Sequence, residues 1–246
     1  MAQALGARVL LITGVHPGFD RSVFAGLDLA SVTVPSNPRY ENTYDSAGNR
    51  TQRLIDPGSP LGGIDWQALP RADVLILAPA YHELASWPPV ESGVAAVSLQ
   101  GALRSTTPDT RVVPIASPEN AAMPLCPPHA FVFFSEEDTP EADALASSLA
   151  ARGLTVVVTR GYHGATLFRG TAVEPHSAIP TVRMVDPTGA GDCFSTTFIV
   201  RYAETGDTGD AMRYALAAGA LAVEGDGLAA VPTRQAIEQR LAQVAA

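Results

Sequence analysis

VRMVDPTGAGDCFSTTFIVRY, residues 182–202, has the pattern of a strand, a tight glycine loop and a helix. The β-branched run at 182–185 is typical of a short strand, and Pro187 and Gly189 end it. Aromatic residues then recur at four-residue steps, which predicts a helix with one buried face. These residues are Phe194, Phe198 and Tyr202.

The start of that helix is a candidate anion site. Gly189, Ala190 and Gly191 would leave their N–H groups free at the positive end of the helix dipole. Asp192 lies in the first turn, where it stays ionised and can accept a proton from a hydroxyl that attacks a phosphate. An acid in a first helical turn is also commonly structural, so the short motif GAGD leaves both interpretations open.

The longer string DPTGAGD, residues 186–192, resembles the C-terminal signature of the PfkB, or ribokinase-like, carbohydrate kinases. The resemblance implies an α/β fold: a three-layer α/β/α ribokinase-like domain with a mostly parallel central sheet and a reduced lid hairpin. It also implies an ATP-dependent kinase in which Asp192 is the base and the N–H groups of residues 189–191 stabilise the transferred phosphoryl group. Thr188 is then expected beside the nucleotide.

Composition excludes several other classes of protein. The net charge is −9, and all 16 basic residues are arginine. Without lysine, a P-loop kinase and Schiff-base chemistry are excluded. The excess of negative charge argues against nucleic acid and anionic membranes as partners, and no apolar run approaches the ~20 residues of a membrane span.

The beginning of the sequence and its cysteines bear on location. The N-terminal residues lack the basic segment of a signal peptide, and Cys126 and Cys193 lack a metal-binding spacing. We expect both to be buried thiols in a reducing compartment, and hence a cytoplasmic protein. The 246 residues are expected to form a single domain, 1–246. The GxGxxG-like string at 189–194 lies far from the first strand, which disfavours a nicotinamide enzyme.

Strands and helices alternate through the middle of the chain. A first strand is predicted at 8–13. Near-continuous apolar runs further on predict parallel strands that are covered on both faces, at 73–79, 94–99, 111–115, 130–134 and 154–159. Helices are predicted over 141–152, over 212–223 and after Thr233, which is a credible N-cap.

Two more segments resemble the nucleotide side of the family. SEED, residues 135–138, stands where the family has Asn-x-x-Glu, which implies that Ser135 and Asp138 position Mg²⁺ and phosphate. A run of acids before a helix is otherwise an ordinary match to the helix dipole. TRGYHGA, residues 159–165, resembles the family's TxGxxGA segment. It implies nucleotide contacts from Thr159, Gly161 and Gly164.

The resemblance implies two further sites around the phosphates. Family members bind a monovalent cation near the DPTGAGD loop, so K⁺ is expected at Asp186 and nearby backbone oxygens. The segment 98–104, SLQGALR, resembles the DxQGxxR segment of the myo-inositol-kinase-like branch, with Ser98 in place of the usual aspartate. Arg104 is expected either to reach phosphate or substrate, or to lie in a solvated loop.

The N-terminal part carries the weakest resemblance. Residues 36–56 are expected to form the lid hairpin, in which Asn42 and Arg50 either face substrate or are solvated. Asp20 is either a counterpart of the family's sugar-binding aspartate or the N-cap of residues 21–27. Nothing matches the family's Gly-Gly-x-x-x-Asn helix, so the substrate side is abbreviated. The uncovered hairpin edge invites pairing, which predicts a homodimer.

The sequence therefore predicts an enzyme that phosphorylates a hydroxyl of a small sugar or polyol, inositols included. A second hypothesis is a catalytically impaired relative that binds nucleotide or polyol as a module. A nucleoside kinase of the same fold is a third. The second and third stay open because the substrate-reading segment is the part that is missing.

Overall fold

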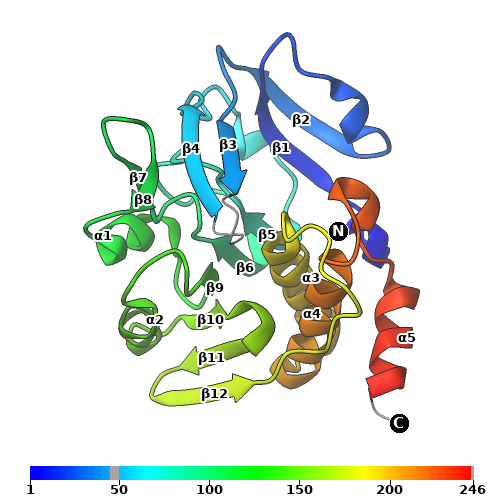
Figure 1. Cartoon of the computed structure of the whole chain (residues 1–246). Helices are drawn as coiled ribbons and strands as arrows, with labels where there is room; N and C mark the ends of the chain where they lie inside the picture. Colours follow the sequence, from blue (N-terminus) through cyan, green and yellow to red (C-terminus); the bar gives the residue numbers. More distant parts are fainter. Residues whose placement is uncertain (45–49, 245–246) are drawn as a thin grey trace.

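A six-stranded sheet forms the centre of the molecule (Figure 1). The structure is a computed structural model that describes residues 1–44 and 50–244, without the side chains of Tyr44 and Arg50. The strand order is β12-β11-β10-β9-β6-β5, with β5, β6, β9 and β10 parallel and β11 and β12 antiparallel. The bounds are β5 Ala72–Leu77, β6 Ser92–Ser98, β9 Phe131–Ser135, β10 Thr155–Thr159, β11 Ala165–Arg169 and β12 Ala172–His176.

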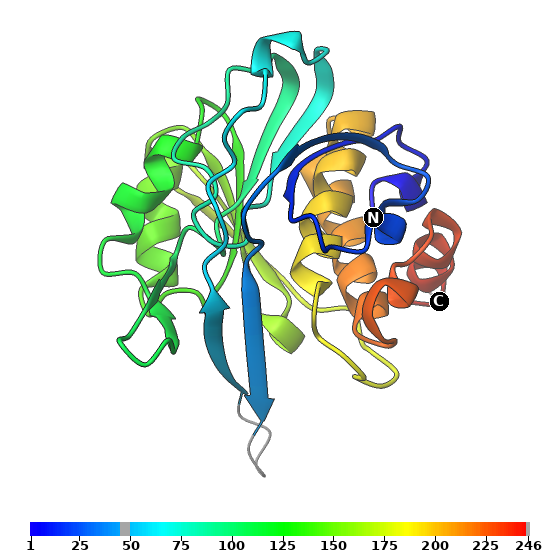
Figure 2. The same ribbon diagram turned by 90° about the horizontal axis from the view of Figure 1, so that it is seen from above.

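Helices cover both faces of this sheet, which confirms the predicted three layers (Figure 2). Side chains alternate along β9, as in any strand. Phe131 and Phe133 pack on one face against Phe198, whereas Val132 packs on the other face with Leu149. The helices are α1 Pro118–Ala122, α2 Ala142–Ala151, α3 Ala190–Thr205, α4 Thr208–Ala222 and α5 Arg234–Val244. In the described residues, no helix is long and apolar enough to cross a membrane.

In residues 1–44 and 50–244, three two-stranded sheets lie outside the central sheet. β1 Leu10–Val15 and β2 Asp28–Thr33 pair in parallel, so the first strand is confirmed but does not join the main sheet. β3 Arg39–Tyr44 and β4 Arg50–Asp56 form the predicted hairpin, which projects from the body in Figure 2, and its turn lies outside the described residues. A cavity of about 330 Å³ separates β1 from β5.

Two strand predictions are wrong. The run at 111–115 contains β8 Val112–Pro114, which pairs antiparallel with β7 Arg104–Thr106 rather than joining the parallel sheet. Residues 182–185 form no strand, because no strand of the described residues pairs with them. Two N–H groups of this segment donate hydrogen bonds to the residues that follow α4 instead. These bonds join the N–H of Val182 to Glu224 Oε1 and the N–H of Val185 to the carbonyl of Val223, both at 2.7 Å.

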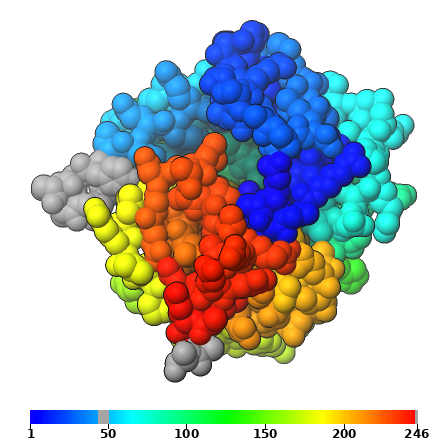
Figure 3. Space-filling model, turned by 90° about the vertical axis from the view of Figure 1, so that its right-hand side faces the viewer, coloured from blue at the N-terminus to red at the C-terminus, as the bar shows by residue number. Residues whose placement is uncertain are grey.

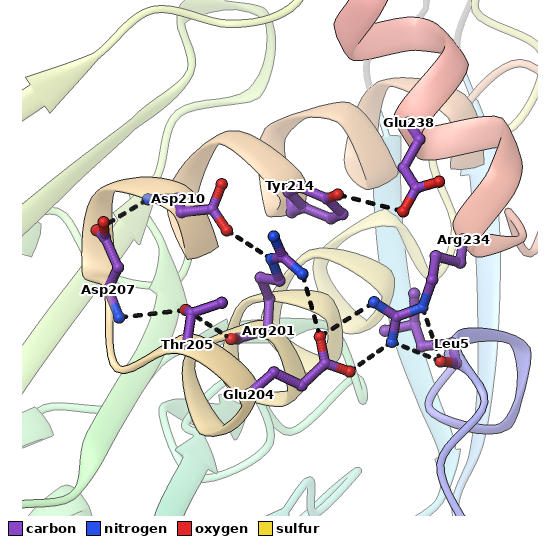
Figure 4. Close-up of polar contacts among 9 residues, drawn as sticks. All are labelled: Leu5, Arg201, Glu204, Thr205, Asp207, Asp210, Tyr214, Arg234 and Glu238. Atoms are coloured by element: carbon purple, nitrogen blue, oxygen red, sulfur yellow. Dashed lines mark hydrogen bonds and ion pairs between the residues drawn. The ribbon is translucent and has the colours of Figure 1, made fainter.

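Short 3-10 turns complete the fold: η1 Gln3–Leu5, η2 Arg21–Phe24, η3 Trp66–Ala68, η4 Met123–Leu125, η5 Gly161–His163 and η6 Gly227–Ala230. A polar network joins η1 to the C-terminal helices (Figure 4). Arg234 donates to the carbonyl of Leu5 and pairs with Glu204, and Arg201 bridges Glu204 and Asp210. The first residues accordingly lie beside the orange and red C-terminal residues in Figure 3.

Candidate active site at the start of helix α3

The N-terminus of α3 presents free backbone donors. Gly189 has φ +79°, a left-handed conformation that favours glycine, and it starts the helix. Within residues 1–44 and 50–244, the N–H groups of Gly189, Gly191 and Asp192 have no hydrogen-bond partner, whereas Ala190 donates to the carbonyl of Pro187 at 3.3 Å. A Cβ atom built at Gly189 or Gly191 would meet nothing within 4 Å. An anion can therefore reach these donors.

Asp192 lies in the first turn of α3. Its side chain is exposed to solvent, yet the surrounding protein crowds it, and desolvation raises the pKa of its carboxyl. The positive charges of Arg104 and of the N-terminal amine lower the pKa and so oppose that rise. A solvent-accessible carboxyl with a raised pKa is a stronger base than an ordinary aspartate once it is ionised.

Arg104 is the first residue of β7, and its positive charge lowers the pKa of Asp192 more than that of the N-terminal amine does. Its charge lowers the pKa of Asp192 and also that of Asp138, so it lies close to both carboxyls. Its guanidinium carbon lies 5.1 Å from the ring centre of Tyr40 in the hairpin. The structure thus brings together residues from β3, β7, the end of β9 and α3.

The loops that carry Arg104 pack backbone against backbone. A Cβ on Gly101 would lie 2.1 Å from the carbonyl oxygen of Pro79, so only glycine fits at that position. His82, with φ +51°, lies in the same loop after β5, and its Nε2 is 2.8 Å from the carbonyl oxygen of Arg104. Since a carbonyl only accepts hydrogen bonds, Nε2 carries the proton here.

Asp138 follows β9 and turns back on it. Its Oδ2 accepts a hydrogen bond from the N–H of Ser135 at 2.8 Å. Desolvation raises the pKa of the Asp138 carboxyl, while that hydrogen bond, Arg104 and Gln100 lower it. One carboxylate at a strand end fits a Mg²⁺ ion that keeps most of its waters, as that ion usually does.

The TRGYHGA segment lies at the carboxyl end of β10. Thr159 ends the strand beside Ser135 of β9, and Gly161 begins η5. At Gly164 a Cβ would lie 2.1 Å from the carbonyl oxygen of His176, so glycine is needed to start the hairpin. Parallel strands place their carboxyl ends at one edge, where ligands bind in open α/β sheets.

Asp186 precedes the anion loop. Its Oδ1 accepts a hydrogen bond from the N–H of Thr188 at 2.9 Å, and this bond lowers the pKa of the carboxyl, with a smaller effect from the N–H of Gly227. Among the described residues, no group of three or more His, Cys, Asp or Glu side chains could hold a metal. Asp138 and Asp186 therefore each offer a single carboxylate, which suits an ion completed by phosphate, water or backbone oxygens.

The predicted substrate residues of the N-terminal part make local contacts in their own segments. Asp20 caps η2 by accepting a hydrogen bond from the N–H of Ser22 at 2.9 Å, which lowers the pKa of its exposed carboxyl. Asn42 accepts a hydrogen bond from Gln52 across the hairpin at 2.9 Å. The side chain of Arg50 lies outside the described residues.

Sequence reasoning missed Tyr40 and His82 as neighbours of Arg104. Tyr40 precedes it by 64 positions and His82 by 22, so no local pattern links the three. An aromatic residue on a predicted lid strand was the single available signal. Cys126 and Cys193 are free and buried, as predicted.

Comparisons with known proteins support the predicted family. Residues 129–234 match the family model described as pfkB family carbohydrate kinase. A ribokinase of Arabidopsis thaliana is 36% identical over 84 residues, which is 33% of this chain and 22% of the relative. An ATP-dependent ribose-1-phosphate kinase of Halopiger xanaduensis is 35% identical over 88 residues, 36% of this chain and 29% of the relative. The matched segment thus spans less than a third of these curated relatives.

Solved structures show the fold over nearly the whole chain. A ribokinase from Thermotoga maritima has a TM-score of 0.69 at 20% identity, covering 95% of this chain and 81% of that one. A pyrophosphate-dependent kinase in the ribokinase family, complexed with a pyrophosphate analog and myo-inositol, has a TM-score of 0.73 at 17% identity, with coverages of 97% and 88%. At such identities the likeness establishes the ribokinase-like fold.

Proposed function

Starting from a ribokinase-like fold whose residues 129–234 match the pfkB family, we propose that this chain is a carbohydrate kinase. It transfers the γ-phosphoryl group of ATP to a hydroxyl of a small sugar or polyol. One observation carries the proposal: unpartnered N–H groups in the described residues at the start of α3 lie next to Asp192, a carboxyl with a raised pKa. That arrangement combines an anion site with a base.

The reaction needs a base, charge stabilisation and alignment. Asp192 takes the proton of the acceptor hydroxyl as its oxygen forms the new bond to the γ-phosphorus. The bond from that phosphorus to the bridging oxygen breaks, and ADP leaves. The N–H groups of Gly189 and Gly191 and the charge of Arg104 stabilise the transferring group. Thr188 and the loop at Thr159, Gly161 and Gly164 would hold the nucleotide.

Two ions accompany the proposal. Mg²⁺ neutralises phosphate charge when bound, and Ser135 and Asp138 would hold it through its waters. Asp186, at the entry of the anion loop, would hold K⁺ together with backbone oxygens. A phosphofructokinase-2 of Escherichia coli that shares the fold has been solved in complex with potassium. Higher turnover in K⁺ than in Na⁺ at equal ionic strength, lost in Asp186→Asn, is the expected result.

The acceptor is proposed to be a polyol of the inositol type. The resemblance of 98–104 to the myo-inositol-kinase-like branch supports this, as does the myo-inositol bound to the pyrophosphate-dependent neighbour. Asn42 and Arg50 on the hairpin, with Asp20, would close over the acceptor in a cytoplasmic enzyme. The outer edge of β3 would pair with that of a second copy, giving a homodimer, since β4 is already bridged to Arg111 on its outer side.

An acceptor screen with a matched variant pair tests the function. The panel contains sugars, inositols and nucleosides, with ATP or pyrophosphate as donor and Mg²⁺ throughout. Asp192→Asn should keep donor binding by calorimetry yet lower kcat by at least about a hundredfold. Asp73→Asn, a change at an exposed acid on β5, should leave kcat unchanged.

Two outcomes decide against the proposal. Full turnover in Asp192→Asn refutes the base. Calorimetric binding of nucleotide or polyol without turnover of any acceptor identifies a binding module in place of an enzyme. Phosphorylation of a nucleoside with no turnover of sugars or inositols moves the acceptor to that class and leaves the site assignment intact.

A further inference from the structure

Tyr40 links the lid hairpin to the strand ends beneath it. Its hydroxyl donates a hydrogen bond to the carbonyl oxygen of Ala80 at 2.7 Å, and its ring is half-buried. Ala80 belongs to the loop after β5, whose N–H groups at Ala80 and Tyr81 are held by the carboxylate of Glu83. The hydroxyl of Tyr40 is thus bound to the loop after β5, and Glu83 holds that loop in place.

The ring of Tyr40 faces the guanidinium of Arg104, 5.1 Å from ring centre to Cζ. This distance is within the range of a cation–π contact, for which arginine is the usual cation. The main chain of Arg104 is held separately, since His82 Nε2 donates to its carbonyl oxygen at 2.8 Å. The backbone and the side chain of Arg104 are therefore held by different residues. His82 binds its carbonyl oxygen, and Tyr40 contacts its guanidinium.

Several charges surround this pair. Arg104 lowers the pKa values of Asp138 and Asp192. Desolvation raises the pKa of Tyr40, hydrogen bonding with Arg104 and the charge of Arg104 lower it, and Glu83 and Tyr81 raise it. Glu137 acts on Asp138, and the N-terminal amine and Cys193 lie near Asp192. Among the side chains that the structure describes, Arg104 is the cation whose charge lowers the pKa of both acids, so its position sets how much positive charge lies beside the proposed phosphoryl path.

We infer that Tyr40 is a positioning residue that holds the Arg104 guanidinium over the site through its ring, coupling the lid hairpin to phosphoryl transfer. The inference rests on the proposed function. It differs from substrate recognition by the lid, because Tyr40 acts through Arg104 and touches neither donor nor acceptor.

Three variants at two positions separate the effects of the ring, the hydroxyl and a neighbouring side chain. Tyr40→Leu removes the ring, and kcat/KM should fall about tenfold, the size of a partly desolvated cation–π contact. Tyr40→Phe keeps the ring and should retain activity within about threefold. Thr43→Val, on the same strand and exposed, is the matched control and should leave kcat/KM unchanged.

A double-mutant cycle tests whether Tyr40 acts through Arg104. Arg104→Met alone should lower kcat/KM by about a hundredfold, and adding Tyr40→Leu to it should change the rate by less than about twofold. The acidic limb of the pH–rate profile should move to higher pH in both single variants, since less positive charge then opposes the raised pKa of Asp192. A merely structural residue would leave that limb in place.

Three results would overturn the inference. They are the same fold-loss for Tyr40→Leu in the Arg104→Met background as alone, equal losses in Tyr40→Phe and Tyr40→Leu, and no loss in Tyr40→Leu. A urea-unfolding cycle on the same variants reports whether the contact exists. If the wild-type chain shows no turnover, the kinase proposal fails, and the same cycle measured as calorimetric affinity for pyrophosphate judges the positioning role by itself.

Discussion

The two ends of the chain are built on different plans. From β9 onward, strands and helices pack on both faces of one continuous sheet, and Val132, Val157 and Phe198 are fully buried. Before β5, the chain forms two separate two-stranded sheets, and most side chains of β1 and β2 are partly exposed. The anion loop and the proposed base lie in the region from β9 onward, and the lid hairpin lies in the region before β5.

This difference teaches which part of a kinase needs a rigid frame. Holding a phosphate requires several donors in fixed positions, which a packed helix start and strand ends supply. Enclosing an acceptor can be left to a hairpin and loops, which tolerate change. In this chain the connection between β1 and β2 contains the short turn η2 in place of the expected Gly-Gly-x-x-x-Asn helix. The abbreviation thus falls on the side that is proposed to bind the acceptor.

The same glycine substitution in both regions gives the sharpest contrast. Gly191→Ala places a methyl group in the open space before the free amides, and it favours the helix by up to about 1 kcal/mol. We expect at least a tenfold loss of pyrophosphate affinity by calorimetry together with an unchanged or higher melting temperature. Gly62→Ala, also with no atom within 4 Å, should change neither quantity. Unaltered affinity in Gly191→Ala would remove the anion site.

An ion pair in each region tests the difference in packing. Arg240 and Glu224 have side-chain exposures of 11% and 19%, and Glu224 also holds the N–H of Val182 ahead of the anion loop. Arg240→Met should cost about 2 kcal/mol in urea unfolding, because it removes the counter-charge and the charged hydrogen bonds of a largely covered carboxylate. Arg8→Met removes a pair with Asp28 whose arginine is 92% exposed, and should cost less than about 0.5 kcal/mol. Equal losses of unfolding free energy in the two variants would contradict the proposed difference in packing between the two regions.

Two aspartates give the smallest effect, a difference in titration. The pKa of Asp192 is raised above the ordinary 3.8 by desolvation, and that of Asp20 is lowered by its hydrogen bonds with Ser22. Asp20 therefore stabilises the fold above its unfolded pKa and loses that contribution as pH falls. Asp192 has the opposite sign, since its contribution is present at low pH and lost as pH rises through its raised pKa. Titration of the carboxyl groups followed by NMR should give a higher pKa for Asp192 than for Asp20. A higher pKa for Asp20 would contradict this prediction.

Patterns of consecutive residues predicted the rigid part well. Continuous apolar runs became β5, β6, β9 and β10, and the four-residue spacing after Gly189 became α3, because both are local signals. The same rule failed at 111–115 and 182–185. A β-branched run is a strand only where a neighbour with free backbone groups is available, and neighbours are decided by distant parts of the chain.

The candidate site divides in the same way. Asp192 and the glycines before it came from one motif, and their geometry follows from the start of a helix. The proximity of Arg104 to Tyr40 depends on how β3 and β7 approach each other, which spacing along the chain does not encode. Asp20 caps η2 in the structure, and its role as a ligand stays a prediction, because a cap and a ligand use the same exposed carboxylate and the sequence alone does not separate them.

Gly101 has a consequence for how such a site can diversify. Because its backbone touches that of Pro79 and Ala80 with no space for a side chain, these two loops cannot shift independently. A change in the preferred acceptor would then require substitutions of side chains around this backbone contact, or a change in the β3–β4 hairpin. Sequence variation among related proteins should therefore concentrate in the β3–β4 hairpin, whereas the contact of Gly101 with Pro79 and Ala80 should be retained.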